Sequence, residues 1–89
     1  MSEPILVTIY YCKKLQKITG KSREFVVTSK NTPFLFFLNA IFTSYPLIMQ
    51  TYPPGTIGLL LNGRPPQDYS FLENNDVVKL IVTNVNFIN

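Results

Sequence analysis

The residue types that most often perform catalysis are scarce in this 89-residue chain. It contains no histidine, which removes the commonest acid–base group and the commonest metal ligand. Its single cysteine, Cys12, has no histidine to activate it and no second cysteine with which to bind zinc, so we expect a packed thiol. The acidic residues are scattered, and no two of them have the spacing of a catalytic pair: Glu3, Glu24, Asp68, Glu73 and Asp76. We therefore expect no catalytic, cofactor-binding or metal-binding residue, and a protein that is not an enzyme.

The aromatic content points to binding instead. Seven Phe and five Tyr are more than one small core usually needs, and a charged content of only 15% leaves much of the surface uncharged. Some aromatic side chains should then be exposed, as is typical of surfaces that bind other proteins. An over-filled core would account for the same composition equally well, and composition alone does not separate the two interpretations.

Positive charge is concentrated in one short stretch, which contains Lys13, Lys14, Lys17, Lys21 and Arg23. A surface that binds nucleic acid would combine such charge with aromatic side chains on which bases stack, and none lies within this stretch. A solvated loop is therefore favoured over a surface that binds nucleic acid or an acidic partner. Binding of nucleic acid is the least favoured of the three functions that we consider for this chain.

The sequence gives no sign of export or of a membrane span. Met1–Pro4 has no basic residue, and the longest apolar run, Phe34–Leu38, is far shorter than the ~18 residues of a membrane helix. A single cysteine excludes an intramolecular disulfide and fits a reducing compartment. We expect one domain over residues 1–89, located in the cytoplasm.

Hydrophobic patterning predicts the elements of this domain. Residues rich in β-branched and aromatic side chains predict strands over 5–12, 24–28, 57–61 and 77–82. The segments 13–22 and 47–56 are expected to be irregular connections. Asn62-Gly63 predicts a tight turn, and Pro65-Pro66 limits any strand after it to a short one at the sheet edge.

One helix is predicted between the second and third strands. Thr32 can cap it with its hydroxyl, and Pro33 suits the first helical position, where no N–H is needed. The helix should continue to Tyr45 and end before Pro46. Its residues are apolar over more than one face.

These elements define an α+β domain with a mixed sheet of four to five strands and one helix packed on one face. The first and last strands are the most apolar, so we expect them side by side at the centre of the sheet. A single helix covers only one face of a sheet, and the other face stays open. One face of the last strand has apolar residues at even positions up to Val82, whereas after Thr83 the apolar residues Val85 and Phe87 stand at odd positions. Either a bulge lies near Thr83 or the tail leaves the sheet.

Two segments of the chain resemble a known family. They are Leu59-Leu60-Leu61-Asn62-Gly63-Arg64 and Leu72-Glu73-Asn74-Asn75-Asp76-Val77-Val78-Lys79-Leu80. Together with the helix end Ser44-Tyr45-Pro46, they are similar to the small sulfur carriers, which include the small subunit of molybdopterin synthase and the thiamine sulfur carrier. The resemblance implies a β-grasp, ubiquitin-like fold.

The chain departs from that family at the position of its terminal glycine pair. Such carriers have Gly-Gly, whose carboxylate is adenylated and converted to a thiocarboxylate, where this sequence has Asn86-Phe87. Glycines allow the tail of such a carrier to enter the narrow channel of an activating enzyme. The side chains of Phe87 and Ile88 are too bulky for that channel. The resemblance therefore predicts the fold, and the tail predicts that the chain is not conjugated through its C-terminus.

Strand parity predicts which residues form the open face. We assign Val7, Ile9, Phe25, Val27, Val78 and Leu80 to the helix-covered core, which leaves Leu6, Thr8, Tyr10, Val26, Val77, Lys79 and Ile81 on the open face. Both faces of the first strand are apolar, so the assignment is a choice between two. Alternatively, the tail with Val85 and Phe87 folds back over this face. The candidate protein-binding residues are Leu6, Tyr10, Val26, Val77, Ile81, Val85 and Phe87.

The leading hypothesis is a non-catalytic protein-binding subunit or adaptor, which binds a partner protein or a second copy through the open face. The alternative is a sulfur carrier with an unusual terminus, acting in molybdopterin or thiamine biosynthesis, as the resemblance implies. Neither hypothesis involves a cofactor, a metal or a membrane.

Overall fold

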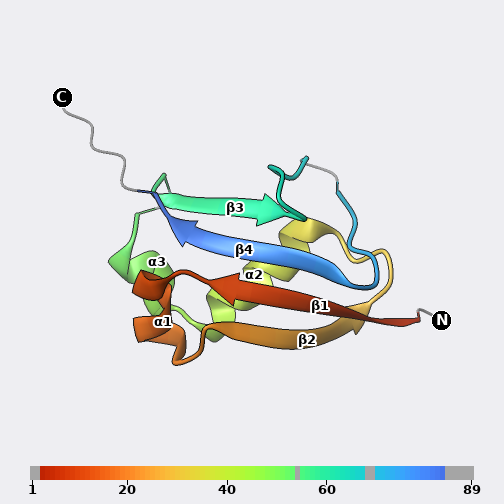
Figure 1. The fold of residues 1–89 in the computed structure, drawn as a ribbon, viewed down its shortest axis with the longest axis horizontal. Coiled ribbons are helices and arrows are strands. Elements are labelled where there is room, and N and C mark those ends of the chain that lie inside the picture. The colour runs from red at the N-terminus through yellow and green to blue at the C-terminus, as the bar shows by residue number, and fades with distance from the viewer. Residues whose placement is uncertain (1–2, 54, 68–69, 84–89) are drawn as a thin grey trace.

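The computed structural model describes residues 3–53, 55–67 and 70–83. Their elements, in chain order, are β1 (Pro4–Tyr11), α1 (Lys13–Thr19), β2 (Arg23–Ser29), α2 (Phe34–Ser44), α3 (Leu47–Thr51), β3 (Ile57–Leu61) and β4 (Asp76–Val82). The four strands form one sheet in the order β2-β1-β4-β3, with α2 behind it (Figure 1).

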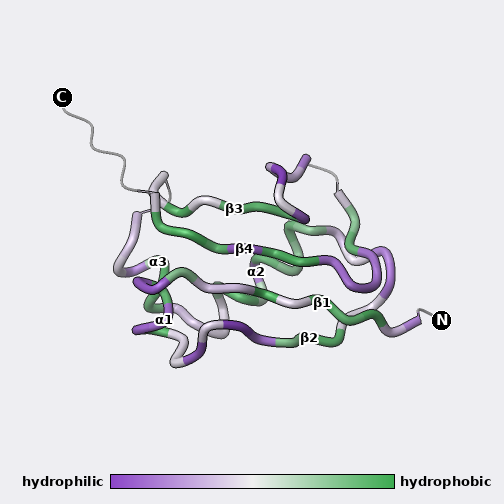
Figure 2. Tube along the Cα trace, viewed as in Figure 1, coloured by the Kyte–Doolittle hydropathy of each residue, from purple (hydrophilic) through white to green (hydrophobic). Residues whose placement is uncertain are grey.

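The first and last strands are the central pair, as the sequence predicts. β1 and β4 run parallel, with Ile9 opposite Val78 and Tyr11 opposite Leu80. β2 and β3 flank them and are antiparallel to their neighbours. Figure 2 shows hydrophobic stretches along both central strands. A parallel pair needs a long crossover between its strands, and here the whole segment between β1 and β4 supplies it.

Helix α2 begins one residue later than expected and without the expected cap. Pro33, with φ −60° and ψ 138°, is the extended residue before the first turn. The Thr32 hydroxyl does not cap the helix but donates a hydrogen bond to the carbonyl of Ser29, at 2.6 Å. The helix ends at Ser44, one residue short of the predicted Tyr45, and the predicted stop before Pro46 is confirmed.

Two short helices replace connections that were expected to be irregular. α1 occupies most of the segment 13–22 and buries Leu15 and Thr19, and Gly20 ends it in the left-handed conformation, with φ 78°. α3 follows Pro46 and buries Ile48. The described residues therefore contain three helices rather than one.

The tight turn at Asn62-Gly63 is present, with φ of 52° and 83°. Leu61 and Arg64 exchange backbone hydrogen bonds across it, at 2.7 and 3.1 Å. The short strand expected after this turn is reduced to that single bridge in the described part of the chain. Pro65 and Pro66 follow at once and cannot donate to a ladder, which explains why pairing stops.

The core lies between the sheet and α2. β1 contributes Ile5, Val7, Ile9 and Tyr11 to it, and all four are buried. The other buried hydrophobic residues are Leu15, Phe34, Phe37, Leu38, Ile41, Ile48, Leu72, Val78 and Leu80. The assignment of Val7, Ile9, Val78 and Leu80 to the core is therefore confirmed.

Candidate protein-binding surface

The open face of the sheet is the surface opposite α2. The strand registers place on it Leu6, Thr8 and Tyr10 of β1, Arg23, Phe25 and Val27 of β2, Val77, Lys79 and Ile81 of β4, and Gly58 and Leu60 of β3. In Figure 1 this face is toward the viewer, and the described helices lie behind the sheet or at its left-hand end.

Four large apolar or aromatic side chains on this face are exposed. Val27 is 69% exposed, Phe25 59%, and Leu6 and Tyr10 37% each. Leu6 lies opposite Val27 on the neighbouring strand, and Thr8 lies opposite Phe25. The exposed side chains are therefore contiguous across β1 and β2, and no other described element packs on them.

The prediction from the sequence exchanged the core-facing and the open-face residues of β2. Val26 lies opposite Val7 and packs against the core, whereas Phe25 and Val27, expected in the core, are on the open face. The apolar residues of β2 belong to both parities, so alternation does not decide between them. Glu24 shares the face of Val26, and its carboxylate accepts hydrogen bonds there from Tyr11 and Tyr45.

The other candidate binding residues have mixed outcomes. Leu6, Tyr10, Val77 and Ile81 are on the open face, and the latter two are half-buried. Val26 is on the opposite face. Val85 and Phe87 lie outside the described residues, so their covering of the face stays a prediction. Phe25 and Val27 are the residues that sequence reasoning missed.

Ile81 is half-buried because Gly58 makes room for it. The two residues are paired between β3 and β4. A Cβ built on Gly58 would lie 2.8 Å from Cγ1 of Ile81 and 3.1 Å from Cγ2 of Thr83. The absence of a side chain at Gly58 thus leaves room for the Ile81 side chain over β3.

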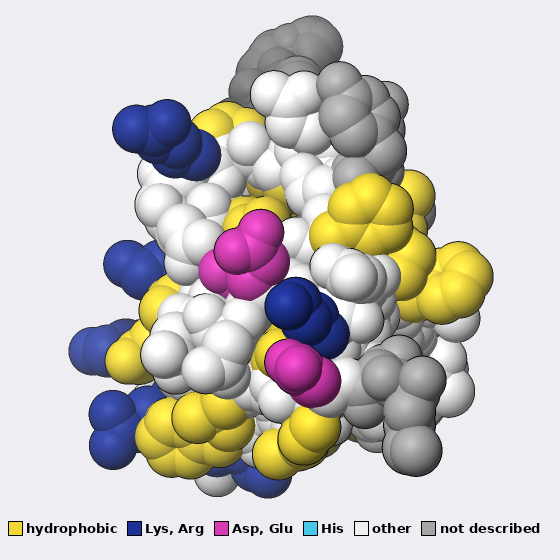
Figure 3. Space-filling view, turned by 90° about the vertical axis from the view of Figure 1, so that its right-hand side faces the viewer, with side chains coloured by type: hydrophobic (Ala, Val, Ile, Leu, Met, Phe, Trp, Pro, Cys, Tyr) yellow, Lys and Arg dark blue, Asp and Glu magenta, His cyan; other side chains and the backbone are white. Residues whose placement is uncertain are grey.

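The charged side chains that the strands contribute to this face are cations. The Arg23 guanidinium lies over the Phe25 ring, 5.3 Å from its centroid, and Lys79 is exposed on β4. The left-hand side of Figure 3 is the front of Figure 1, and Lys and Arg side chains gather along it. The open face is therefore apolar with positive charge, a combination that suits an apolar partner surface with acidic residues.

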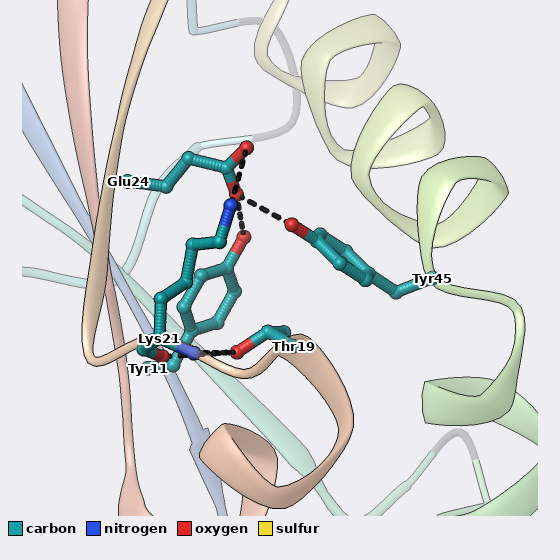
Figure 4. A network of polar contacts seen from close by, with 5 residues as sticks. All are labelled: Tyr11, Thr19, Lys21, Glu24 and Tyr45. Carbon is teal, nitrogen blue, oxygen red and sulfur yellow. Dashed lines mark hydrogen bonds and ion pairs between the residues drawn. The ribbon is translucent and has the colours of Figure 1, made fainter.

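A polar cluster lies on the opposite face of the sheet, at the start of β2 (Figure 4). Tyr11 and Tyr45 each donate a hydroxyl hydrogen bond to Oε1 of Glu24, at 2.8 and 3.0 Å. The two rings meet edge to face, 6.0 Å between centroids, and Nζ of Lys21 lies 3.9 Å from Oε2 of Glu24. The cluster thereby joins β1, β2 and the end of α2.

This cluster is suited to structure rather than to acid–base chemistry. Burial, and then the hydrogen bond and charge of Glu24, raise the pKa of Tyr11 well above its ordinary value of 10.0. A phenol that holds its proton this firmly is a poor general acid at neutral pH. Among residues 3–53, 55–67 and 70–83, no three His, Cys, Asp or Glu side chains group as metal ligands would. No described helix is both long and apolar enough to cross a membrane.

Solved structures share this fold. No protein-family model and no curated protein matches the chain's sequence. The small archaeal modifier protein 1 of H. volcanii superimposes with a TM-score of 0.73 at 14% identity, covering 89% of this chain and 98% of that one. The same-named protein of Methanosarcina acetivorans gives 0.74 at 14% identity, covering 96% and 99%.

A putative molybdopterin converting factor, subunit 1, from Pyrococcus furiosus gives a TM-score of 0.75 at 15% identity, covering 89% of this chain and 98% of that one. The protein therefore has an α+β, β-grasp fold. It shares this fold with the small archaeal modifier proteins and with the putative molybdopterin converting factor subunit, and the β-grasp fold that the sequence resemblance implied is confirmed.

Proposed function

We propose that this protein is a non-catalytic binding subunit or adaptor, which binds a partner protein non-covalently through the open face of its sheet. The observation that carries the proposal is the exposure of Phe25 and Val27 beside Leu6 and Tyr10 on one face. Burial of a side chain of this kind stabilises a complex by roughly 1.5–3 kcal/mol. Two strongly exposed and two partly exposed side chains of this kind make a coherent apolar centre for an interface.

The charge on the open face favours a different protein over a second copy. Two copies that met face to face would place four cations, Arg23 and Lys79 of each, in one interface, and like charges in an interface are unfavourable. A partner with Asp or Glu around an apolar centre would instead pair with both cations. The proposed partner is therefore an acidic protein surface.

Non-covalent binding also agrees with the residues that follow β4. Residues 83–89 read Thr-Asn-Val-Asn-Phe-Ile-Asn and include no glycine. The sulfur carriers that the chain resembles use a glycine pair at this distance from their last turn. The similarity to a putative molybdopterin converting factor keeps sulfur transfer as the second candidate. Incubation with an adenylating enzyme, ATP and a sulfur donor tests it, because replacement of one oxygen by sulfur would show in the intact mass.

The open face is tested by a pair of double variants. Phe25→Glu with Val27→Glu places two acids on the open face, and Leu35→Glu with Leu47→Glu places two at similarly exposed positions on the helices. The partner retained by the tagged wild-type protein is identified, purified and titrated calorimetrically against all three proteins. We expect the open-face variant to lose binding while it stays folded, and the control variant to bind like the wild type.

Two results would contradict the proposal. One is unchanged affinity of the open-face variant for the purified partner. The other is unfolding of that variant when sedimentation shows that the wild type is strictly monomeric and retains no partner. A concentration-dependent dimer that the open-face variant abolishes would make a second copy the occupant in place of an acidic protein.

A further inference from the structure

The outward face of α2 is uncharged and carries large apolar side chains. From Asn31 to Gly63, a stretch that contains α2, α3 and β3, the chain has no charged residue. A helix at the surface of a globular protein ordinarily carries charged or polar side chains on the face that water covers. At the start of α2, however, Phe36 is 71% exposed and Leu35 is 58% exposed. The helix therefore presents to solvent a surface of the kind that proteins usually bury.

Other exposed apolar side chains extend this surface beyond both ends of α2. Phe71 is 55% exposed, and it forms a backbone bridge with Pro33, directly before the first turn of α2. Leu47, at the start of α3, is exposed to the same extent. The right-hand side of Figure 3 is the rear of Figure 1, where α2 lies, and hydrophobic side chains protrude along it. The apolar surface is thus larger than the single exposed side chains that are normal in any protein.

The outward residues of α2 are large at its start and small toward its end. Successive residues of a helix are turned by about 100°, so Phe36, Asn39 and Thr43 lie in one row opposite the buried side. Leu35 and Ala40 lie on either side of that row. All five residues are exposed. The first turn therefore presents two bulky apolar side chains, and the following turns present three shorter ones.

This order of sizes lets two copies of the helix fit together when they pack antiparallel. A two-fold axis that passes between Asn39 and Ala40 places Phe36 of each copy opposite Thr43 of the other, so a large side chain meets a small one at both ends. Asn39 of each copy then lies beside the axis, where the two carboxamides can donate hydrogen bonds to each other. The face is therefore complementary to itself in shape, and the polar group near its centre has a partner.

Charge favours a second copy on this face, although it disfavours one on the open face. The open face contributes Arg23 and Lys79, which two copies would bring into one interface. Neither α2 nor α3 contributes a charge, so two copies that meet through these helices bring no like charges together there and desolvate no charge of the helices. A strongly charged partner would gain no ion pair from the helices. The occupant that the surface fits is one that is itself apolar and uncharged, as a second copy of α2 is.

We propose that the protein forms a homodimer joined through α2, in which Phe36 and Leu35 of each copy pack over the Thr43 end of the other copy's helix. The open face lies on the other side of the sheet from α2, so this dimer presents two open faces that point away from each other (Figure 1). Two linked faces bind a partner that has two sites more tightly than one face does. This consequence rests on the function proposed above, but the dimer itself does not.

Charged substitutions at the paired positions test the dimer and its register. Phe36→Lys should weaken dimerisation by about tenfold or more, because it replaces the main apolar contact with a cation. Thr43→Glu should weaken it as well, because the carboxylate would lie under Phe36. The combination of the two substitutions places a Lys opposite a Glu at both ends of the interface and should dimerise more strongly than either single variant. Sedimentation equilibrium measures the dissociation constants, and circular dichroism checks that each variant is folded.

Two further variants separate this dimer from the open face. Phe25→Lys makes the same change at a similarly exposed position of the open face, and it should dimerise like the wild type. Leu35→Glu with Leu47→Glu, the control variant of the open-face experiment, should be monomeric and still bind the partner with unchanged affinity per protomer. Failure of the dimer is therefore distinguishable from failure of the proposed function.

Four results would overturn the proposal. They are a wild type that stays monomeric across the concentration range, a dimer that Phe36→Lys leaves unchanged, a dimer that Phe25→Lys abolishes, and a combined variant that dimerises no better than its two parents. Thr43→Glu decides in place of Phe36→Lys should the latter fail to fold. Monomeric wild type that binds phosphatidylcholine vesicles, and loses this binding in Phe36→Lys, would make a lipid surface the occupant instead of a second copy.

Discussion

The two faces of β1 carry side chains of similar hydrophobicity but differ in what covers them. Val7 and Ile9 are fully buried beneath α2, whereas Leu6 and Tyr10, their immediate neighbours in the chain, are each 37% exposed. The strand sequence explains why β1 lies at the centre of the sheet. The position of the single long helix decides which face becomes the core. The apolar side chains of the open face therefore contribute less to stability than those of the core, which agrees with the binding role proposed for that face.

Truncation of one phenylalanine on each side of the sheet should show the largest difference. Phe34 is 2% exposed in α2 and Phe25 is 59% exposed on the open face. Phe34→Ala should lower the free energy of unfolding by about 3–5 kcal/mol, because it leaves a cavity in the core. Phe25→Ala should lower it by about 1 kcal/mol or less, most of it from the lost contact with Arg23. Urea denaturation measures both, and equal losses would show that the open face is internal.

Removal of the Tyr11 hydroxyl should have an intermediate effect at neutral pH. Tyr11→Phe deletes one of the two phenolic donors to Glu24 but keeps the ring in place against Tyr45. The expected loss is about 1 kcal/mol in the free energy of unfolding, since Glu24 retains Tyr45 and Lys21. Tyr45→Phe is the matched control, and a similar loss would show that Glu24 needs both donors.

The same hydroxyl should make stability depend on pH in the alkaline range. The folded protein raises the pKa of Tyr11 above 10.0, mainly through burial. Above pH 10 the unfolded chain therefore releases this proton while the folded chain keeps it, and stability falls as pH rises. The slope from this one group approaches about 1.4 kcal/mol per pH unit. Urea denaturation from pH 8 to 11 should show a steeper loss for the wild type than for Tyr11→Phe.

Removal of charge from α1 should have the smallest effect. Lys13, Lys14 and Lys17 are exposed, and the first two lie at the helix N-terminus, where positive charge is slightly unfavourable. Replacement of all three by Gln should change the free energy of unfolding by less than about 1 kcal/mol. It should also leave binding at the open face unchanged. Salt-dependent binding of RNA or DNA that this triple variant abolishes would favour the nucleic-acid hypothesis instead.

Most of the sheet could be predicted from the sequence because its strands differ sharply in composition from their surroundings. β3 has the predicted bounds, Ile57–Leu61, and the central pairing of β1 with β4 follows from their apolar content. The short helices could not be predicted in the same way. α1 buries only Leu15 and Thr19. Two buried residues, one of them polar, are too few to make a helical pattern stand out in the sequence.

The open face could be predicted in part. Tyr10 and Ile81 were placed on it correctly, although both faces of β1 are apolar and the assignment was a choice between two parities. Val26 was placed wrongly because β2 has apolar residues at both parities, so alternation alone does not show which of them faces the core. Glu24 is tolerated on the same face as Val26 because Tyr11 and Tyr45, both distant in sequence, donate hydrogen bonds to its carboxylate. No local sequence pattern predicts hydrogen bonds of this kind.

The central position of β1 and β4 also has a consequence for synthesis of the protein. β1 begins at Pro4 and β4 ends at Val82, yet these two strands are direct neighbours. A ribosome releases the chain from its N-terminus, so β1 emerges long before the strand that completes the core. Until β4 pairs with β1, the apolar surfaces of the β1–β2 hairpin and of α2 stay exposed. Strand pairs of such large sequence separation also form slowly. We expect folding to be completed only after Val82 has left the exit tunnel, which makes the nascent chain a client for chaperones during that interval.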